Sequence, residues 1–260
     1  MVGQRGTLSS LRQMTEKFKI QQAYSSGSAI DKYRSLVFGR GGVLRLLGFE
    51  LVMLLCAKRS GALGLFLRKH AYPWILGSVG RNVVFGTSIT LRHPHKIHIG
   101  DNVVIDDYVS LDAKGEDNHG IVLNDGVFIG RNTILSCKDG DITLMENANL
   151  GFNCVISSTN SVTVGRDNIV AAYTYLLGGG SYEFDEISTP IRENYDYTGK
   201  GGVFTGDNVW IGAHVTVLDG VNIETGCVVG AGSVVSRSLP ADSVAAGTPA
   251  KVIRKRRTPA

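Results

Sequence analysis

An aliphatic side chain recurs every six residues through most of this chain, and this period constrains the fold more than any other feature of the sequence. A period of six over many repeats indicates a repeat architecture rather than hairpins, which would place turn signals at irregular spacing. The recurring positions are Val79, Phe85 and Leu91; Ile99, Ile105 and Leu111; Leu123, Ile129 and Leu135; Leu144, Leu150 and Ile156; Val164, Val170 and Leu176; and Thr205, Ile211, Val217, Ile223, Val229 and Val235.

Three short strands make one triangular coil of about eighteen residues, in which each aliphatic side chain stacks on its equivalent one coil away. Glycine commonly follows the aliphatic residue, as at Gly130 and Gly212, where the backbone turns between flat faces. Small or β-branched residues such as Thr133 and Cys227 stand four places on, where an inward side chain meets a crowded corner. We therefore predict an all-β fold, a left-handed parallel β-helix over residues 79–236.

The spacing between these triplets places every insertion after the third strand of a coil, so all insertions should emerge at one corner. The longest insertion is the Gly-rich loop 177–204, and the second-longest separates Leu111 from Leu123. Long loops on rigid scaffolds are disproportionately functional. The loop 177–204 is long enough to reach a neighbouring chain.

Residues 1–78 lack the repeat and predict an N-terminal α-helical extension. Residues 41–76 have the pattern of a helical hairpin, and the apolar stretch from Val43 to Cys56 is too short and too charged to cross a bilayer. Two interpretations remain open: a helix packed on the first coil, or a helix lying at a membrane interface. The cations that flank the apolar stretch are Arg45, Lys58, Arg59, Arg68 and Lys69.

The net charge of +4 is concentrated in a C-terminal basic tail, residues 237–260, which suits a phosphate-bearing ligand or a solvated terminus. No aromatic residues alternate with the basic ones, which argues against nucleic-acid binding. The four cysteines form no CxxC pair, so we expect free thiols in a reducing compartment. The amino terminus lacks the pattern of a secretory signal. We expect a cytoplasmic protein, or one peripheral to the inner face of the membrane.

Residues 206–256, GDNVWIGAHVTVLDGVNIETGCVVGAGSVVSRSLPADSVAAGTPAKVIRKR, resemble the carboxyl end of hexapeptide-repeat acyltransferases. The resemblance is to sugar O-acetyltransferases and related capsule or lipopolysaccharide acyltransferases, and it extends back to about residue 79. It is specific, because GAGSVV followed by LP and AGTPAKVIR is much narrower than a bare hexapeptide ladder. It implies a homotrimer that binds acetyl-CoA or a similar acyl-CoA between two β-helices and acylates a hydroxyl or amine of a sugar.

The same resemblance implies the cofactor-binding residues. Small side chains that let the pantetheine arm lie along the backbone match Gly212, Ala213, Ala231, Gly232 and Ser233. The end of the groove, where cations meet the nucleotide phosphates, matches Thr248, Pro249, Ala250, Lys251 and Arg254. Glycines at these places also turn the coils, and both roles can hold together.

Acyl transfer to a hydroxyl needs a general base, and histidine fits that demand best near neutral pH. In the resembled enzymes the base is a His in the long excursion, whereas here the segment GGGSYEFD contains Ser181 and Tyr182 and no His. Two substitutes stand out. His119 lies in the second-longest insertion, at the corner of the excursion, and His214 should point outward into the region expected for the thioester. Tyr182 is a third candidate, as a weak base or an acceptor-binding group.

Acceptor binding is predicted for the acidic excursion, through Ser181, Tyr182 and Asp185, and Asp112 is placed to orient His119. The carboxylates of Glu183 and Glu186 add to the acidity of the loop. The group formed by His93, His95 and His98 could bind a metal, but Pro94 favours a turn there. We predict that no metal is required.

Two other classes of protein share the scaffold. A β-helix carbonic anhydrase needs three His ligands on zinc from adjacent chains, and the spacing from His119 to His214 offers no close pair. A non-catalytic trimeric scaffold or coenzyme-binding subunit is consistent with the missing loop His. Metal content separates the first class from an acyltransferase. Calorimetry with acetyl-CoA, together with a thiol-release assay, separates the second.

Overall fold

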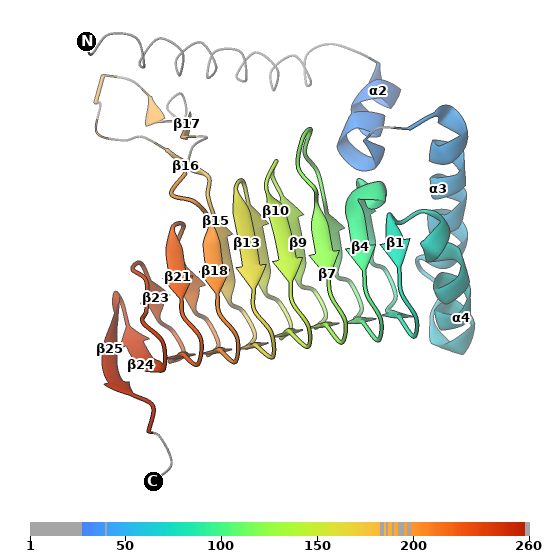
Figure 1. Cartoon of the computed structure of the whole chain (residues 1–260). Coiled ribbons are helices and arrows are strands. Elements are labelled where there is room, and N and C mark those ends of the chain that lie inside the picture. The colour runs from blue at the N-terminus through green and yellow to red at the C-terminus, as the bar shows by residue number, and fades with distance from the viewer. Residues whose placement is uncertain are drawn as a thin grey trace.

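The repeat region forms a three-sided solenoid of short parallel strands (Figure 1). The computed structural model describes residues 28–39, 41–182, 185, 187, 188, 190, 191, 195, 196 and 199–257. Each coil contributes one strand to each of three flat sheets, which we call A, B and C, and the chain visits them in that order.

Sheet A contains β1 (Ser78–Val79), β4 (Ile97–Ile99), β7 (Ile121–Leu123), β10 (Asp141–Leu144), β13 (Ser161–Val164), β18 (Val203–Thr205) and β21 (Val221–Ile223). Sheet B contains β2 (Val84–Phe85), β5 (Val104–Ile105), β8 (Phe128–Ile129), β11 (Asn149–Leu150), β14 (Ile169–Val170), β19 (Trp210–Ile211), β22 (Val228–Val229), β24 (Ser243–Gly247) and β25 (Ala250–Lys255). Sheet C contains β3 (Thr90–Arg92), β6 (Ser110–Asp112), β9 (Ile134–Cys137), β12 (Val155–Ser158), β15 (Tyr175–Gly178), β20 (Thr216–Val217) and β23 (Val234–Val235).

The interior of the solenoid is filled by the aliphatic ladder that the period of six predicts. The strand register pairs equivalent positions of successive coils, as in Ile105 with Ile129 and Leu111 with Leu135. These side chains are fully buried. Because every inward side chain stacks on a similar one, the core is continuous from the first coil to the last.

One rung of the ladder is polar, where Thr205 occupies an aliphatic slot and is fully buried. Its hydroxyl oxygen accepts hydrogen bonds from the backbone N–H of Gly165 at 3.1 Å and from Asn168 Nδ2 at 2.7 Å. The buried hydroxyl of Thr205 therefore has hydrogen-bond partners.

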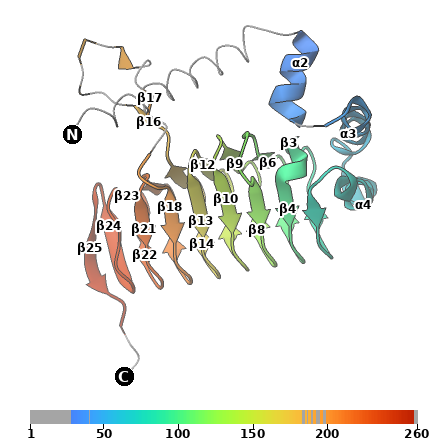
Figure 2. The ribbon, with the colours of Figure 1, turned by 45° about the horizontal axis from the view of Figure 1, so that its top comes forward.

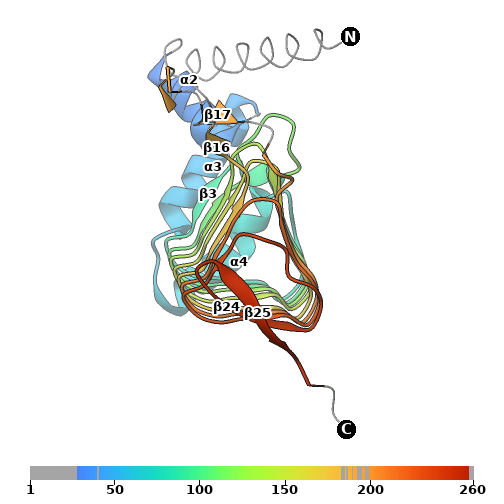
Figure 3. The same ribbon diagram turned by 90° about the vertical axis from the view of Figure 1, so that its left-hand side faces the viewer.

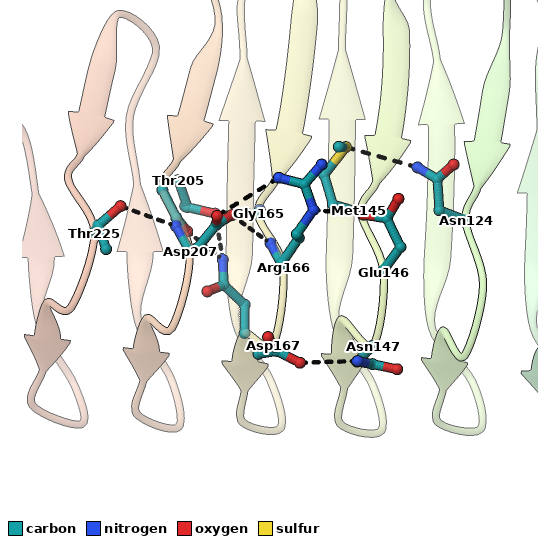
Figure 4. A network of polar contacts seen from close by, with 12 residues as sticks. Asn124, Met145, Glu146, Asn147, Gly165, Arg166, Asp167, Thr205, Asp207 and Thr225 are labelled. Atoms are coloured by element: carbon teal, nitrogen blue, oxygen red, sulfur yellow. Dashed lines mark hydrogen bonds and ion pairs between the residues drawn. The ribbon is translucent and has the colours of Figure 1, made fainter.

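Ion pairs join neighbouring coils at the corner between sheets A and B (Figure 4). Arg166 pairs with Glu146 at 2.9 Å and with Asp207 at 3.6 Å, so side chains of three coils are connected there.

All the insertions leave the solenoid at the corner between sheets C and A, as predicted. Viewed along the solenoid, they project together from one corner of the triangle (Figure 3). The longest one contains a small antiparallel pair, β16 (Ser181–Tyr182) with β17 (Tyr195–Asp196).

The N-terminal helices cover the first coil, at the end of the solenoid opposite to the β24–β25 hairpin (Figures 1 and 2). They are α2 (Ala29–Tyr33), η1 (Arg34–Phe38), α3 (Val43–Cys56), α4 (Gly61–Ala71) and η2 (Tyr72–Trp74), and a further short helix, η3 (Pro94–Lys96), lies between β3 and β4. Phe49 and Cys56 of α3 join the core, and Tyr72 packs edge-on against Phe85 of β2 at 5.0 Å between ring centroids. The predicted helical extension is confirmed from Ala29 onward, and residues 1–27 of the predicted segment lie outside the described residues. Among the described residues, no helix has the length and apolar character needed to span a bilayer.

Arg68, one of the cations named for the interfacial interpretation of the helices, is buried and therefore cannot contact a membrane. Only 1% of the residue is exposed. Its guanidinium donates hydrogen bonds to the carbonyl oxygens of Phe85 at 2.9 Å and Cys56 at 3.1 Å, and to that of Arg59. These carbonyls belong to β2, to the end of α3 and to the turn before α4, so one side chain joins both helices to the first coil.

Candidate functional site

The corner between sheets B and C gathers most of the residues that the sequence assigns to cofactor binding. Gly232 donates its backbone N–H to the carbonyl oxygen of Ala213 at 2.8 Å. Thr248, in the turn between β24 and β25, places its hydroxyl 3.4 Å from the carbonyl oxygen of Gly232. Residues of two coils and of the C-terminal hairpin therefore meet at this corner.

The surface at this corner is open because its side chains are small or absent. Ala231 and Gly232 are exposed and Ala213 is half-buried. Gly232 has a φ of +71°, and a Cβ added there would meet no atom within 4 Å. A strip of backbone is thus accessible to an extended ligand.

Gly212 and Ser233, by contrast, face the interior. A Cβ on Gly212 would lie 2.6 Å from the backbone nitrogen of Ala231, so glycine is needed there for the coils to stack. Ser233 is fully buried; its hydroxyl donates to the carbonyl oxygen of Gly230 at 2.6 Å and accepts from the N–H of Gly247 at 3.1 Å. Ser233 holds the end of β24 in place, and its side chain does not reach the surface.

His214 stands next to this open strip, exposed and with a left-handed φ of 58°. Its ring stacks on Tyr173 with centroids 4.8 Å apart and planes 2° from parallel. Tyr173 in turn meets Phe152 edge-on at 5.4 Å, and the Arg131 guanidinium lies 5.5 Å from the centre of the Phe152 ring. The expectation that His214 points outward is confirmed.

This column of rings was missed by our sequence reasoning, although a signal was present. Tyr173 and His214 each follow an aliphatic ladder residue by three places, Val170 and Ile211 respectively. Equivalent places in neighbouring coils lie about 4.8 Å apart, so two rings there must stack.

His119 lies at a different corner, between sheets C and A. The Asp141 carboxylate accepts hydrogen bonds from the backbone N–H groups of His119 at 2.7 Å and Gly120 at 2.8 Å. The Lys96 ammonium holds the same loop by donating to the carbonyl oxygen of Gly115 at 2.8 Å and to Asn118 Oδ1 at 2.7 Å. Within one chain, therefore, the two candidate histidines are not brought together.

The carboxylate that holds the His119 segment is Asp141, which we had not singled out. Asp112 lies in the same region, but its carboxylate pairs with Arg92 at 3.5 Å and accepts from the N–H of Lys114 at 3.1 Å. Neither contact involves His119.

The excursion begins with β16, whose residues Ser181 and Tyr182 pair with Asp196 and Tyr195. Tyr182 and Asp185 are exposed, whereas Glu183 and Glu186 lie outside the described residues. The end of the excursion is anchored by the Asp219 carboxylate, which accepts hydrogen bonds from the backbone N–H groups of Lys200 at 2.5 Å and Gly202 at 2.7 Å. The acceptor-binding candidates of the excursion therefore lie at the corner opposite to sheet B.

The two cations assigned to the end of the groove lie on β25. Lys251 and Arg254 are both exposed. Strand β25 runs antiparallel to β24 from the turn that contains Thr248 and Pro249. The cations thus follow directly from the part of the hairpin that contacts Gly232.

Metal and thiol chemistry receive no support from the described residues. No three His, Cys, Asp or Glu side chains gather there in a way that could hold a metal ion. His93 is buried with its Nε2 2.9 Å from the carbonyl oxygen of Ser35, and burial lowers its pKa. The four cysteines are buried and unpaired, and burial raises the pKa of the Cys137, Cys154 and Cys227 thiols.

Residues 202–237 match the family model described as bacterial transferase hexapeptide (six repeats). This stretch of the chain is therefore similar to hexapeptide-repeat transferases. The solenoid is the left-handed parallel β-helix that the sequence predicted.

Two curated relatives are both named as acetyltransferases. The chain is 39% identical over 120 residues to a putative lipopolysaccharide biosynthesis O-acetyl transferase, WbbJ, of Escherichia coli K12, an alignment covering 45% of this chain and 61% of the relative. It is 30% identical over 191 residues to a probable acetyltransferase of Mycobacterium tuberculosis, covering 73% of this chain and 61% of the relative. The chain thus spans about three fifths of the length of these two relatives.

Among solved structures, a mutant of AntD resembles this chain at 25% identity with a TM-score of 0.49, covering 78% of this chain and 92% of that one. AntD is an N-acyltransferase from Bacillus cereus, and its structure is a complex with dTDP and coenzyme A.

Proposed function

We propose that this protein transfers an acetyl or similar acyl group from coenzyme A to a hydroxyl or amine of a sugar. The observation that carries the proposal is the open strip of backbone at the corner between sheets B and C, with His214 beside it and the cationic strand β25 beyond. An acyl-CoA has an extended neutral arm and a phosphorylated end. The neutral arm needs an uncharged track, and the phosphates need positive charge at the end of that track. The names of the two curated relatives favour the same chemistry.

In this proposal the pantetheine arm lies along Ala213, Ala231 and Gly232. The Thr248–Pro249 turn borders the track. Lys251 and Arg254 bind the nucleotide phosphates, because an ammonium and a guanidinium both form charge-assisted hydrogen bonds with phosphate oxygens.

His214 is the proposed general base, because it is the histidine that shares a corner with the track. As the acceptor oxygen or nitrogen attacks the thioester carbonyl carbon, the imidazole takes its proton. Backbone N–H groups stabilise the oxyanion that forms. The C–S bond then breaks, and the proton passes to the departing thiolate of coenzyme A. His119 is the second candidate for this role and Tyr182 the third, and a base at the sheet C–A corner would have to come from another copy of the chain.

The acceptor is proposed to bind to the excursion through Ser181, Tyr182 and Asp185. The exposed residues Tyr182 and Asp185 carry a hydroxyl and a carboxylate, which suit the hydrogen bonds that a sugar offers. Asp112 lies at the same corner, at the end of β6, and the insertion that contains His119 follows it. We also propose a cytoplasmic location, because buried unpaired cysteines are typical of proteins in reducing compartments.

A homotrimer is part of the proposal, because the excursion and the proposed cofactor track occupy different corners of one chain. An excursion from one copy can serve the track of the next only if copies pack side by side. The outer face of sheet B offers an apolar surface for this contact. Its exposed outward side chains include Val84, Phe128, Ile169 and Trp210. Exposed apolar patches of this kind mark interaction surfaces.

Changing Ile169 and Trp210 together to Glu is expected to dissociate the assembly, because like charges would be buried at each contact. Light scattering after size exclusion should then give the mass of one 27.9 kDa chain, whereas the unmodified protein should give three times that mass. The matched control is Phe204→Glu, an exposed aromatic of sheet A. A monomeric unmodified protein would contradict the trimer.

Removing the cations of β25 is expected to weaken the binding of acetyl-CoA. Lys251→Ala and Arg254→Ala should each raise KM for acetyl-CoA by about tenfold, because a hydrogen bond to a charged group contributes about 1.5–3 kcal/mol. A thiol-release assay with a panel of sugars measures KM, and Lys138→Ala, an exposed cation at the sheet C–A corner, is the control.

Calorimetry with acetyl-CoA tests the same site without turnover. Binding with no thiol release for any sugar would favour a non-catalytic coenzyme-binding subunit. No binding at all would contradict the proposed function.

A further inference from the structure

Helix α3 exposes an apolar side that the solenoid does not cover. It packs on the rest of the protein through Phe49 and Cys56, which are buried. Leu44 is 85% exposed and Leu54 is 79% exposed. The exposed aliphatic residues of the helix are Val43, Leu44, Leu47, Leu51, Leu54 and Leu55. The helix thus has two apolar sides, of which only one is used in the described structure.

The exposed residues form one continuous stripe. At about 100° per residue, the six side chains fall within an arc of roughly 120°, on the side of α3 away from Phe49 and Cys56. The two charged residues of α3, Arg45 and Glu50, lie outside this arc, and Glu50 accepts a hydrogen bond from the Tyr33 hydroxyl. The stripe itself therefore has no charge.

Helix α4 and the short helix after it, η2, also expose apolar side chains. Leu63 is 65% exposed, Phe66 is 60% exposed and Trp74 is 88% exposed. The two helices lie together against the first coil (Figure 1). We call the exposed apolar residues of α3 and α4, with Trp74, the helical patch. Apolar surface of this extent on a soluble domain marks an interaction site.

The charges around the helical patch indicate what covers it. Residues 43–77 contain five Lys or Arg and one Asp or Glu. Of the basic side chains, Arg68 is buried, whereas Lys58 and Arg59 follow α3 and are exposed, as is Lys69 of α4. A second copy docked symmetrically on the patch would bring the same cations together, which is unfavourable. An anionic lipid surface offers both the apolar interior and the opposite charge.

We propose that the helical patch binds the surface of an anionic lipid bilayer, with the leucine stripe of α3 at the boundary between headgroups and acyl chains. The helix lies in the plane of the membrane, because 14 residues span only about 21 Å, less than the roughly 30 Å of hydrocarbon. This inference goes beyond the proposed function and does not depend on it. Together with that function, it places the solenoid beside lipid-linked acceptors.

Flotation of the full-length protein with vesicles tests the proposal directly. The protein should float with vesicles of phosphatidylcholine and phosphatidylglycerol, and several-fold less with phosphatidylcholine alone. The double variant Leu44→Gln, Leu54→Gln should bind the anionic vesicles at least about tenfold more weakly, because both side chains lose their apolar contact with lipid. The control is Ile187→Gln, Ile191→Gln, which makes the same change at residues 97% and 57% exposed in the excursion.

A second variant acts through charge and leaves the stripe intact. Lys58→Gln, Arg59→Gln should lose most of the preference for anionic vesicles, about fivefold per cation at low salt. No flotation of the unmodified protein, or equal flotation of the leucine variant, would overturn the proposal. A leucine variant that changes the mass of the assembly, while the unmodified protein ignores vesicles, would assign the patch to contacts between copies and also overturn it.

Discussion

Replacing His214 by Asn is expected to lower kcat for acyl transfer by about two to four orders of magnitude, the usual contribution of a positioned general base. Asparagine is the matched replacement because Asn132 and Asn153 occupy the equivalent left-handed positions of earlier coils, with φ values of 58° and 55°. The backbone at residue 214 should therefore be retained. KM for acetyl-CoA should change little, since the cations of β25 are untouched.

The control for this variant is His119→Ala, because His119 lies at the other corner of the same chain. If His119→Ala abolishes turnover while His214→Asn leaves it unchanged, the base comes from the sheet C–A corner of a neighbouring copy. Full turnover in both variants would contradict a histidine base, and Tyr182→Phe would then become the next variant to measure. Thermal denaturation of each variant shows whether a lost activity reflects lost folding.

Replacing Arg68 by Met is expected to lower the free energy of unfolding by about 3–5 kcal/mol, because it removes three hydrogen bonds between a buried charged group and backbone carbonyl oxygens. Met keeps the length and apolar stem of the side chain, so the change isolates the guanidinium. The carbonyl oxygens of Cys56, Arg59 and Phe85 each lose a partner. At about 2–4 °C per kcal/mol for a chain of this size, Tm should fall by roughly 10 °C.

Lys69→Met is the control for Arg68, because Lys69 is the next residue of α4 and is exposed. Its Tm should stay within about 2 °C of the unmodified protein. Denaturant unfolding followed by circular dichroism measures both variants. A change below about 1 kcal/mol for Arg68→Met would mean that water replaces the guanidinium and that the helices do not depend on it.

The residues of the proposed cofactor track could be predicted from the sequence, whereas the surroundings of the two candidate histidines could not. Ala213, Ala231 and Gly232 were found from a resemblance in a local motif, and the repeat brings them to one corner. The partners of His214 and of the His119 loop were not found. Tyr173 lies in a different coil from His214, and Asp141 in a different coil from His119. Neither residue belongs to a motif that would have singled it out in the sequence.

The six-residue period was enough to predict the solenoid, its three-strand coil and the corner at which the insertions leave it. The reason is that each coil repeats one local pattern and contacts only its neighbours, so that a period in the chain becomes a period in space. The role of Arg68, the stacking of His214 on Tyr173 and the exposure of the leucine stripe of α3 could be seen only in the folded chain. Each of these features depends on contacts between segments that lie far apart in the chain or share no repeat. The order of side chains along the chain does not specify such contacts.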